Sequence, residues 1–86
     1  MKITVKSIFE PNETELDTQS TTLGTLLDEL SHNQRMMTDQ FFDSELRELY
    51  SDCEVMVNGQ AMTDGLDTKL KDGDRVEIYL IMRGGG

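Results

Sequence analysis

The sequence predicts an α+β domain in which a mixed sheet of four to five strands carries one main helix on one face. Residues 2–9 and 75–82 alternate apolar and polar side chains with the two-residue period of a strand that is buried on one face. Between these segments, four leucines follow the i, i+3, i+4, i+7 spacing of one helical face: Leu23, Leu26, Leu27 and Leu30. Strands at both ends of the chain and a helix between them favour two packed layers.

The first strand is expected to form a hairpin with a short second strand. The alternation breaks at Ser7, so the strand ends or bulges before Pro11. A turn at residues 11–13 then leads to residues 15–18, which can pair antiparallel with the first strand although they contain few apolar side chains.

The main helix follows three residues that are all suitable N-caps, Ser20, Thr21 and Thr22. Its leucine pattern ends near residues 32–33. Gly24 lies in the first helical turn, where glycine costs about 1 kcal/mol relative to alanine. A close approach of the helix to the sheet would explain a glycine at this position.

Residues 34–50 are expected to contain a second, shorter helix that starts after a cap at Thr38 and Asp39. Four apolar side chains fit one helical face of this segment: Phe42, Leu46, Leu49 and Tyr50. Three further apolar residues fall beside that face: Met36, Met37 and Phe41.

The last third of the chain is expected to complete the sheet. Residues 55–57 read as a strand, and Asn58-Gly59 predicts a tight turn that returns the chain through residues 60–62. A second turn, at residues 71–74, precedes the final strand. Because the first and last strands are the most apolar, we expect them to pair in parallel at the sheet centre, which is the ubiquitin-like β-grasp arrangement.

The length and charge of the chain limit the possible classes of protein. With 86 residues and 9.8 kDa, it can bury one hydrophobic core, so residues 1–86 are expected to form one β-grasp domain. The 17 acidic and 8 basic residues give a net charge of −9 at pH 7, which disfavours binding to nucleic acid. The first residues lack the apolar run of a signal peptide or membrane span, so we expect a cytoplasmic protein that does not bind membranes.

The carboxyl-terminal residues are the candidate reactive part of the chain. Gly84, Gly85 and Gly86 lack side chains, so we expect a flexible tail that can enter a narrow active-site channel of a partner. Its terminal carboxylate is ionised at neutral pH and can attack an activated phosphate. The three glycines could instead be an extension without a function. The apolar strand directly before them favours a functional tail, because such a strand makes the tail start from a fixed point on the folded domain.

Four segments resemble a known family, the ubiquitin-like sulfur carriers, which include the small subunit of molybdopterin synthase and the carrier of the thiazole pathway. They are residues 22–30 (TLGTLLDEL), 55–60 (VMVNGQ) and 70–76 (LKDGDRV) and the final Gly85-Gly86. The resemblance covers most of the chain. The molybdopterin branch is the closer match, because the thiazole carrier is typically shorter and lacks a segment like residues 34–50.

The resemblance implies a role as a non-catalytic carrier. Gly86 would be adenylated by an ATP-dependent enzyme of the ubiquitin-activating type and then converted to a thiocarboxylate. The sulfur would pass to the large subunit of molybdopterin synthase or to another acceptor. Gly84, Gly85 and Arg83 would thread into the partner's active site. This chain would bind no cofactor itself, since ATP is used by the partner.

Arg83 departs from the molybdopterin branch, whose members usually have small or apolar residues, often proline, before the two glycines. An arginine at this place resembles ubiquitin, whose tail is conjugated to lysines. A ubiquitin-like protein modifier is therefore an alternative, because carriers and modifiers share the same activation step. An interaction module with a chemically idle tail is a third possibility.

A partner-docking face is expected beside the tail. Tyr79 and Ile81, with Met56, are predicted to lie on the sheet face opposite the helix, where they would form an apolar patch. The alternative is that residues 34–50 cover this face.

Two other residues are candidate sites, Cys53 and His32. Cys53 could carry a persulfide or form a thioester, but a lone cysteine next to a strand is more often a small core residue. His32 is expected to have a capping or solvent role near the helix end. Because the sequence contains one cysteine and one histidine, neither an internal disulfide nor a structural metal site is expected.

Overall fold

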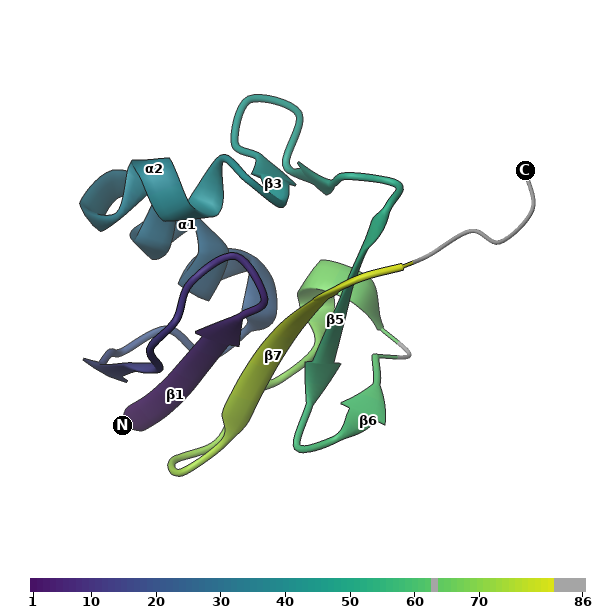
Figure 1. Ribbon diagram of the computed structural model, residues 1–86. Coiled ribbons are helices and arrows are strands. Elements are labelled where there is room, and N and C mark those ends of the chain that lie inside the picture. Colours follow the sequence, from purple (N-terminus) through teal and green to yellow (C-terminus); the bar gives the residue numbers. More distant parts are fainter. Residues whose placement is uncertain (63, 82–86) are drawn as a thin grey trace.

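The structure is a computed structural model that describes residues 1–62 and 64–81 (Figure 1). Five strands form one sheet in the order β2-β1-β7-β5-β6. Their bounds are β1 Lys2–Ser7, β2 Thr14–Asp17, β5 Cys53–Val57, β6 Gln60–Ala61 and β7 Arg75–Leu80. With the main helix on one face, this confirms the predicted α+β class and the β-grasp sheet.

The first and last strands lie side by side in the middle of the sheet, as predicted. β1 pairs in parallel with β7, whereas β2 and β5 run antiparallel to their neighbours in the sheet. Four side chains of the central pair are completely or almost completely buried: Ile3, Val5, Val76 and Ile78. A strand on each side of this pair protects its backbone, so its apolar side chains can form the floor of the core.

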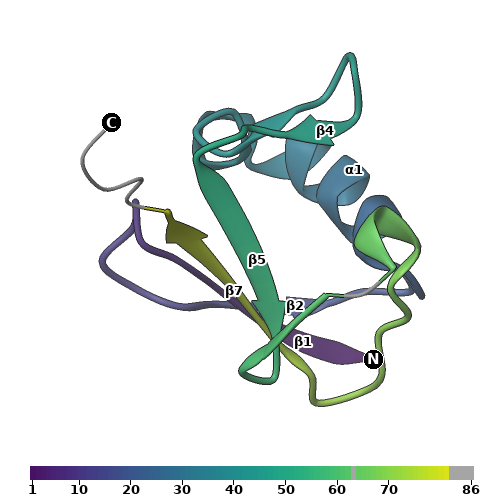
Figure 2. The ribbon, with the colours of Figure 1, turned by 90° about the vertical axis from the view of Figure 1, so that its right-hand side faces the viewer.

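The main helix, α1 (Leu23–Asn33), packs on one face of this sheet (Figure 2). Thr22 is its N-cap, since the Thr22 hydroxyl accepts a hydrogen bond from the Thr25 backbone N–H at 3.3 Å. The predicted leucine face is buried, and the helix ends where the sequence indicated. In the part of the chain that the structure describes, no helix is long and apolar enough to cross a membrane.

Gly24 makes a close approach, but to a different part of the molecule than predicted. A β-carbon placed on it would lie 3.0 Å from Nη2 of Arg47 and 3.1 Å from the carbonyl oxygen of Leu66. Leu66 belongs to a short 3-10 helix, η1 (Gly65–Asp67). The expected approach of Gly24 to the sheet is therefore wrong, because this glycine makes room for η1 and for the Arg47 side chain on the outer side of α1.

Residues 34–50 differ most from the prediction. One helical turn, α2 (Arg35–Thr38), precedes a separate two-stranded hairpin of β3 (Phe42–Asp43) and β4 (Glu48–Leu49). The predicted helix after Thr38 and Asp39 is therefore wrong.

The burial of two adjacent phenylalanines explains this difference. Phe41 and Phe42 are both 0% exposed, whereas Leu46, in the loop of the hairpin, is 68% exposed. A helix that buried Phe42 would also turn Leu46 inward, since residues four apart share a helical face. The hairpin instead lets both rings reach the core while the polar loop stays in solvent.

The strand ends also differ in detail from the prediction. β1 ends at Ser7 instead of residue 9, because the Ser7 carbonyl and hydroxyl oxygens accept hydrogen bonds from the N–H groups of Glu10 and Phe9, both at 3.1 Å. β2 and β6 lie within one residue of their predicted positions. β7 ends at Leu80, and residue 82, the predicted end of this strand, lies outside the described residues.

Candidate functional site

The candidate site begins where the last strand ends. The four predicted tail residues lie outside the described residues: Arg83, Gly84, Gly85 and Gly86. β7, which leads to them, is paired on both sides, and the Ile81 N–H donates a hydrogen bond to the Asp52 carbonyl oxygen at 2.7 Å. The chain therefore leaves the sheet from a fixed point close to the start of β5 (Figure 1).

The sheet face opposite α1 carries exposed apolar side chains at this point. Tyr79 and Ile81 are 39% and 38% exposed, and Met56 on β5 is half-buried. Residues 35–49 lie on the helix side of the sheet (Figure 2), where their phenylalanines join the core formed with α1. They leave Tyr79 and Ile81 uncovered, and we call this surface the outer face.

Ile8 belongs to the outer face and was not identified from the sequence. It is 56% exposed, and its N–H donates a hydrogen bond to the Ile78 carbonyl oxygen at 3.1 Å, which holds it beside β7. It lines a shallow groove of about 290 Å³ with five other residues: Lys6, Arg75, Glu77, Ile78 and Tyr79. The sequence carried no clear signal for Ile8, because it lies in the turn after β1, where the two-residue period of a strand no longer applies.

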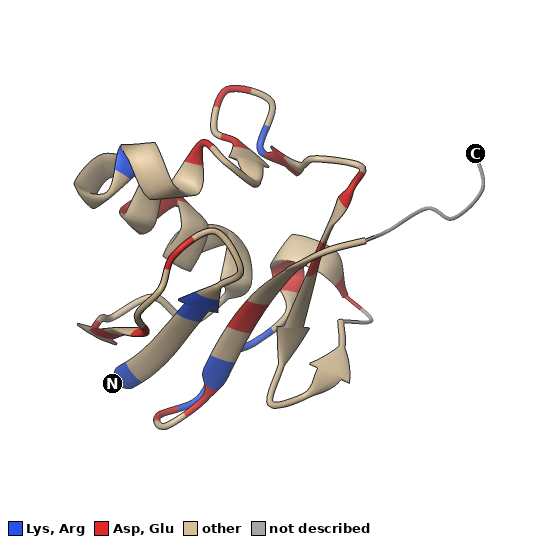
Figure 3. Ribbon diagram, in the orientation of Figure 1, with Lys and Arg blue, Asp and Glu red and all other residues tan. Residues whose placement is uncertain are grey.

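A chain of polar contacts fixes Tyr79 on this face. The Tyr79 hydroxyl donates to Oε2 of Glu77 at 2.9 Å, and Nε of Arg75 lies 3.6 Å from the same oxygen. Arg75 also forms an ion pair with Glu13, from the loop before β2. Figure 3 shows this alternation of charges on β7. The sequence signal was the spacing Arg75-x-Glu77-x-Tyr79, which places all three side chains on one sheet face.

These contacts shift two pKa values. The hydrogen bond from Arg75 lowers the pKa of Glu13, because the guanidinium stabilises the ionised carboxylate. The hydrogen bond to Glu77 raises the pKa of the Tyr79 phenol, since ionisation would break that bond and place two negative charges together. Tyr79 therefore presents a neutral ring and hydroxyl at neutral pH, which suits an amphipathic protein contact.

Cys53 and His32 lie apart from this face. Cys53 is buried in the core, and burial together with the Asp52 carboxylate raises the pKa of its thiol, which keeps it protonated and unreactive. Its predicted role as a small core residue is confirmed. His32 is exposed in the last turn of α1. Within the described ranges, no group of three or more histidine, cysteine, aspartate or glutamate residues could hold a metal ion.

The sheet order, the central parallel pair and the helix on one face define a ubiquitin-like protein of the β-grasp fold. The model of the ThiS family matches residues 4–85, so the chain belongs to the ThiS family. This family consists of ubiquitin-like sulfur carriers and modifiers, small proteins that are generally not catalysts. The resemblance seen in the sequence is thus confirmed at the level of the family.

Three solved structures are similar over nearly the whole chain. SAMP1, the small archaeal modifier protein 1 of Haloferax volcanii, is 22% identical with a TM-score of 0.75, and the match covers 99% of this chain and 100% of that chain. CysO of Mycobacterium tuberculosis is 25% identical with a TM-score of 0.73, covering 93% and 99% of the two chains. No curated protein sequence matches this chain.

The third structure contains a partner. It is the protein–protein complex of subunits 1 and 2 of the molybdopterin-converting factor of Helicobacter pylori. Its matching chain is 22% identical with a TM-score of 0.59, and the match covers 99% of this chain and 100% of that chain. Relatives of this fold are therefore found in complexes with other proteins.

Proposed function

We propose that this chain is a sulfur carrier whose terminal glycine, Gly86, is adenylated and converted to a thiocarboxylate for molybdopterin biosynthesis in the cytoplasm. The main support is its membership of the ThiS family together with a sequence that closes on Gly85-Gly86 shortly after a strand paired on both sides. Residues 34–50, with their α2 turn and hairpin, support the molybdopterin branch over the shorter thiazole carrier.

In this proposal the carboxylate of Gly86 is the substrate of another enzyme. One carboxylate oxygen attacks the α-phosphorus of ATP held by the partner, pyrophosphate leaves, and the carboxyl carbon becomes electrophilic. A hydrosulfide ion, HS⁻, supplied by a sulfur donor then attacks that carbon and AMP leaves with the electrons of the broken C–O bond; loss of the S–H proton gives the thiocarboxylate. The chain supplies no side chain to either step, so its contribution is to present the tail in the right place.

The folded body would present the tail by docking through the outer face. Five residues follow Ile81, and an extended segment of that length spans at most roughly 17 Å. The body must therefore bind close to the partner's active site. Tyr79, Ile81 and Ile8 are exposed around the strand end, and Met56 lies half-buried beside them, so they are the residues we assign to this contact.

A second candidate function is a protein modifier joined to lysines through Gly86. Two observations favour it: Arg83 precedes the glycines as in ubiquitin, and SAMP1 is named a modifier protein. Intact-mass analysis of the chain isolated from its own cells distinguishes the two functions. Replacement of one terminal oxygen by sulfur favours the carrier, and branched peptides that end in the tail favour the modifier.

The shared activation step is tested by Gly86→Trp. The bulky side chain cannot follow the glycines into a narrow channel, so we expect ATP–pyrophosphate exchange by the adenylating enzyme to fall to background. Thermal unfolding should stay unchanged, because Gly86 lies beyond the last strand. Exchange at the rate of the unchanged chain would contradict both candidate functions.

A further inference from the structure

The last residues of β7 have a neighbouring strand on one side only. β1 ends at Ser7, which pairs with Ile78, so β7 runs on beyond the end of β1. The chain after β1 turns away, because the Glu10 N–H donates to the Ser7 carbonyl oxygen at 3.1 Å. On the other side, β5 pairs with β7 as far as Leu80. The edge that β1 leaves open therefore lies at the end of β7, close to the tail in the sequence.

Leu80 directs its backbone N–H and C=O groups toward this open edge. In an antiparallel pair, every second residue of a strand bonds to its neighbour. The Asn58 N–H of the β5 side donates to the Arg75 carbonyl oxygen at 2.8 Å. The Ile81 N–H donates to the Asp52 carbonyl oxygen at 2.7 Å. Leu80 is out of step with Arg75 and Ile81, so its groups point away from β5. Among the residues that the structure describes, none bonds to them.

The side chains at the end of β7 are apolar on both faces of the sheet. Val76 and Ile78 point to the core and are at most 1% exposed, whereas Leu80, the next residue on that face, is 40% exposed. Tyr79 and Ile81, on the outer face, are exposed to a similar degree. The core layer therefore ends before Leu80, and a partner can contact both faces of the strand end.

An extended backbone is the ligand that these features match. Ile78, which points the same way as Leu80, already accepts the Ile8 N–H at its carbonyl oxygen, at 3.1 Å. Leu80 offers one donor and one acceptor, which another strand satisfies with its own C=O and N–H groups. Successive side chains of that strand point to opposite faces, so apolar ones can cover Leu80 and Tyr79 together. A backbone is uncharged, so the net charge of −9 does not oppose this contact.

We infer that an extended, apolar segment of the adenylating enzyme adds to the sheet as a strand beside Leu80. The inference rests on the proposed function, in which this enzyme receives the tail. The added strand fixes the position and the direction of the chain just before the tail enters the enzyme. It also extends the docking contact of the outer face, because Tyr79 takes part in both.

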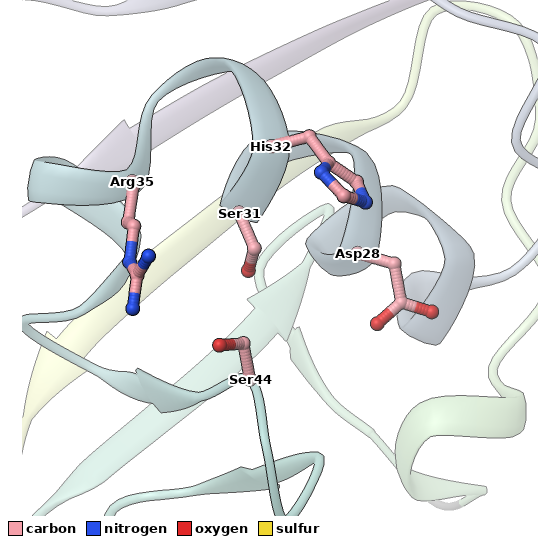
Figure 4. Close-up of a pocket in the computed structure, with 5 residues that line it drawn as sticks. All are labelled: Asp28, Ser31, His32, Arg35 and Ser44. Atoms are coloured by element: carbon pink, nitrogen blue, oxygen red, sulfur yellow. The ribbon is translucent and has the colours of Figure 1, made fainter.

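Hydrogen exchange of the full-length chain, resolved to single amides, tests the inference directly. The probe is the purified adenylating enzyme of the organism that makes this chain, in excess and without ATP, so that no reaction follows binding. In the free chain, the Leu80 amide should exchange faster than those of Tyr79 and Ile81, which bond to the β5 side. With the enzyme bound, exchange at Leu80 should slow by at least about tenfold. The amides of Ser31 and His32, which line a hollow between α1 and the hairpin (Figure 4), serve as the control and should not change.

Two replacements of Leu80 separate its N–H from its side chain. Leu80→Pro removes the N–H, and the sheet tolerates this change because the N–H points away from β5. Leu80→Ala keeps the N–H and removes most of the apolar side chain. We expect calorimetry to show about tenfold weaker binding to the adenylating enzyme for Leu80→Pro than for Leu80→Ala, which corresponds to the loss of one interface hydrogen bond. The matched control is Ala61→Pro on the edge strand β6, which should bind as the unchanged chain does.

The inference is overturned if Leu80 exchanges equally fast in the free and the bound chain, or if the two Leu80 variants bind equally well. It is also overturned if Leu80 becomes protected in the chain alone as its concentration rises, since the occupant would then be a second copy. If Leu80→Pro unfolds the chain, the hydrogen-exchange result decides.

Failure of the proposed function has a different signature. The enzyme would then not bind the unchanged chain and ATP–pyrophosphate exchange would stay at background, which overturns both proposals. Binding and pyrophosphate exchange without protection of Leu80 would leave the proposed function intact and remove only this inference.

Discussion

Asn58 joins the two turns that flank β5 and β7, and we predict that its replacement lowers stability in a residue-specific way. Its side-chain amide donates to Oδ1 of Asp74 at 2.8 Å, and its side-chain oxygen accepts the Arg75 backbone N–H at 2.9 Å. Its φ is +54°, in the left-handed region, and that of Gly59 is +78°. The sequence predicted the turn at Asn58-Gly59, whereas the contacts to Asp74 and Arg75 come from residues far along the chain.

The contribution of the Asn58 side-chain hydrogen bonds and the cost of its left-handed backbone can be separated by comparing Asn58→Ala with Asn58→Gly. Both changes remove two exposed hydrogen bonds, each worth about 0.5 kcal/mol. Alanine must in addition adopt a left-handed conformation, at a cost of about 1 kcal/mol that glycine avoids. We therefore expect the free energy of unfolding to fall by about 2 kcal/mol for Asn58→Ala and by about 1 kcal/mol for Asn58→Gly.

Urea unfolding followed by far-UV circular dichroism measures both values. Gln60→Ala, an exposed change in the same hairpin, serves as the control and should alter the free energy by less than about 0.5 kcal/mol. The reasoning would be refuted if the alanine and glycine variants were equally stable, because the left-handed backbone would then carry no cost. It would also be refuted if both matched the control, because the side-chain hydrogen bonds would then contribute nothing.

Three further predictions concern the core, the outer face and the response to pH. Phe42→Ala should lower the free energy of unfolding by about 3–5 kcal/mol in the same urea assay, since the ring is fully buried. A loss below about 1 kcal/mol would show that the hairpin adds little to the core. Tyr79→Ser should weaken binding to the adenylating enzyme of the proposed function about tenfold in calorimetry without changing the fold, and unchanged affinity would remove Tyr79 from the proposed docking contact. The hydrogen bond from Arg75 lowers the folded-state pKa of Glu13 below its ordinary value of 4.5. The ion pair therefore stabilises the fold at every pH above 4.5. This stabilisation is lost as the pH falls through the folded-state pKa. Glu13→Gln should therefore show a smaller drop in melting temperature between neutral and acidic pH, and an equal drop would contradict the assignment.

The β-sheet and main helix could be predicted because each has a local signal strong enough to decide its structure. The alternation at Ile3 and Val5 fixes which side chains of β1 face the core, and the leucine spacing does the same for α1. The segment around Phe42 could not be predicted in this way. Its apolar spacing fits a helix and a hairpin about equally, and the choice depends on whether both Phe41 and Phe42 find space under α1 and β5.

The candidate site was predicted only in part. Tyr79 and Ile81 follow from the strand period, which places them on the face opposite the helix. Ile8 and Glu13 come from the turns that follow β1 and precede β2, and a two-residue period says nothing about residues in turns. They reach Tyr79 and Arg75 because β1 and β7 are neighbours, a pairing between the two ends of the chain.

The sequence by itself determined the order of the main elements and the faces they bury, since these depend on neighbours within a few residues. The tertiary structure alone decided how distant segments meet. It placed Arg47 and η1 against Gly24 and aligned Asn58 with Asp74. Such contacts depend on the simultaneous packing of several elements in three dimensions, and the local pattern of side chains does not encode that packing.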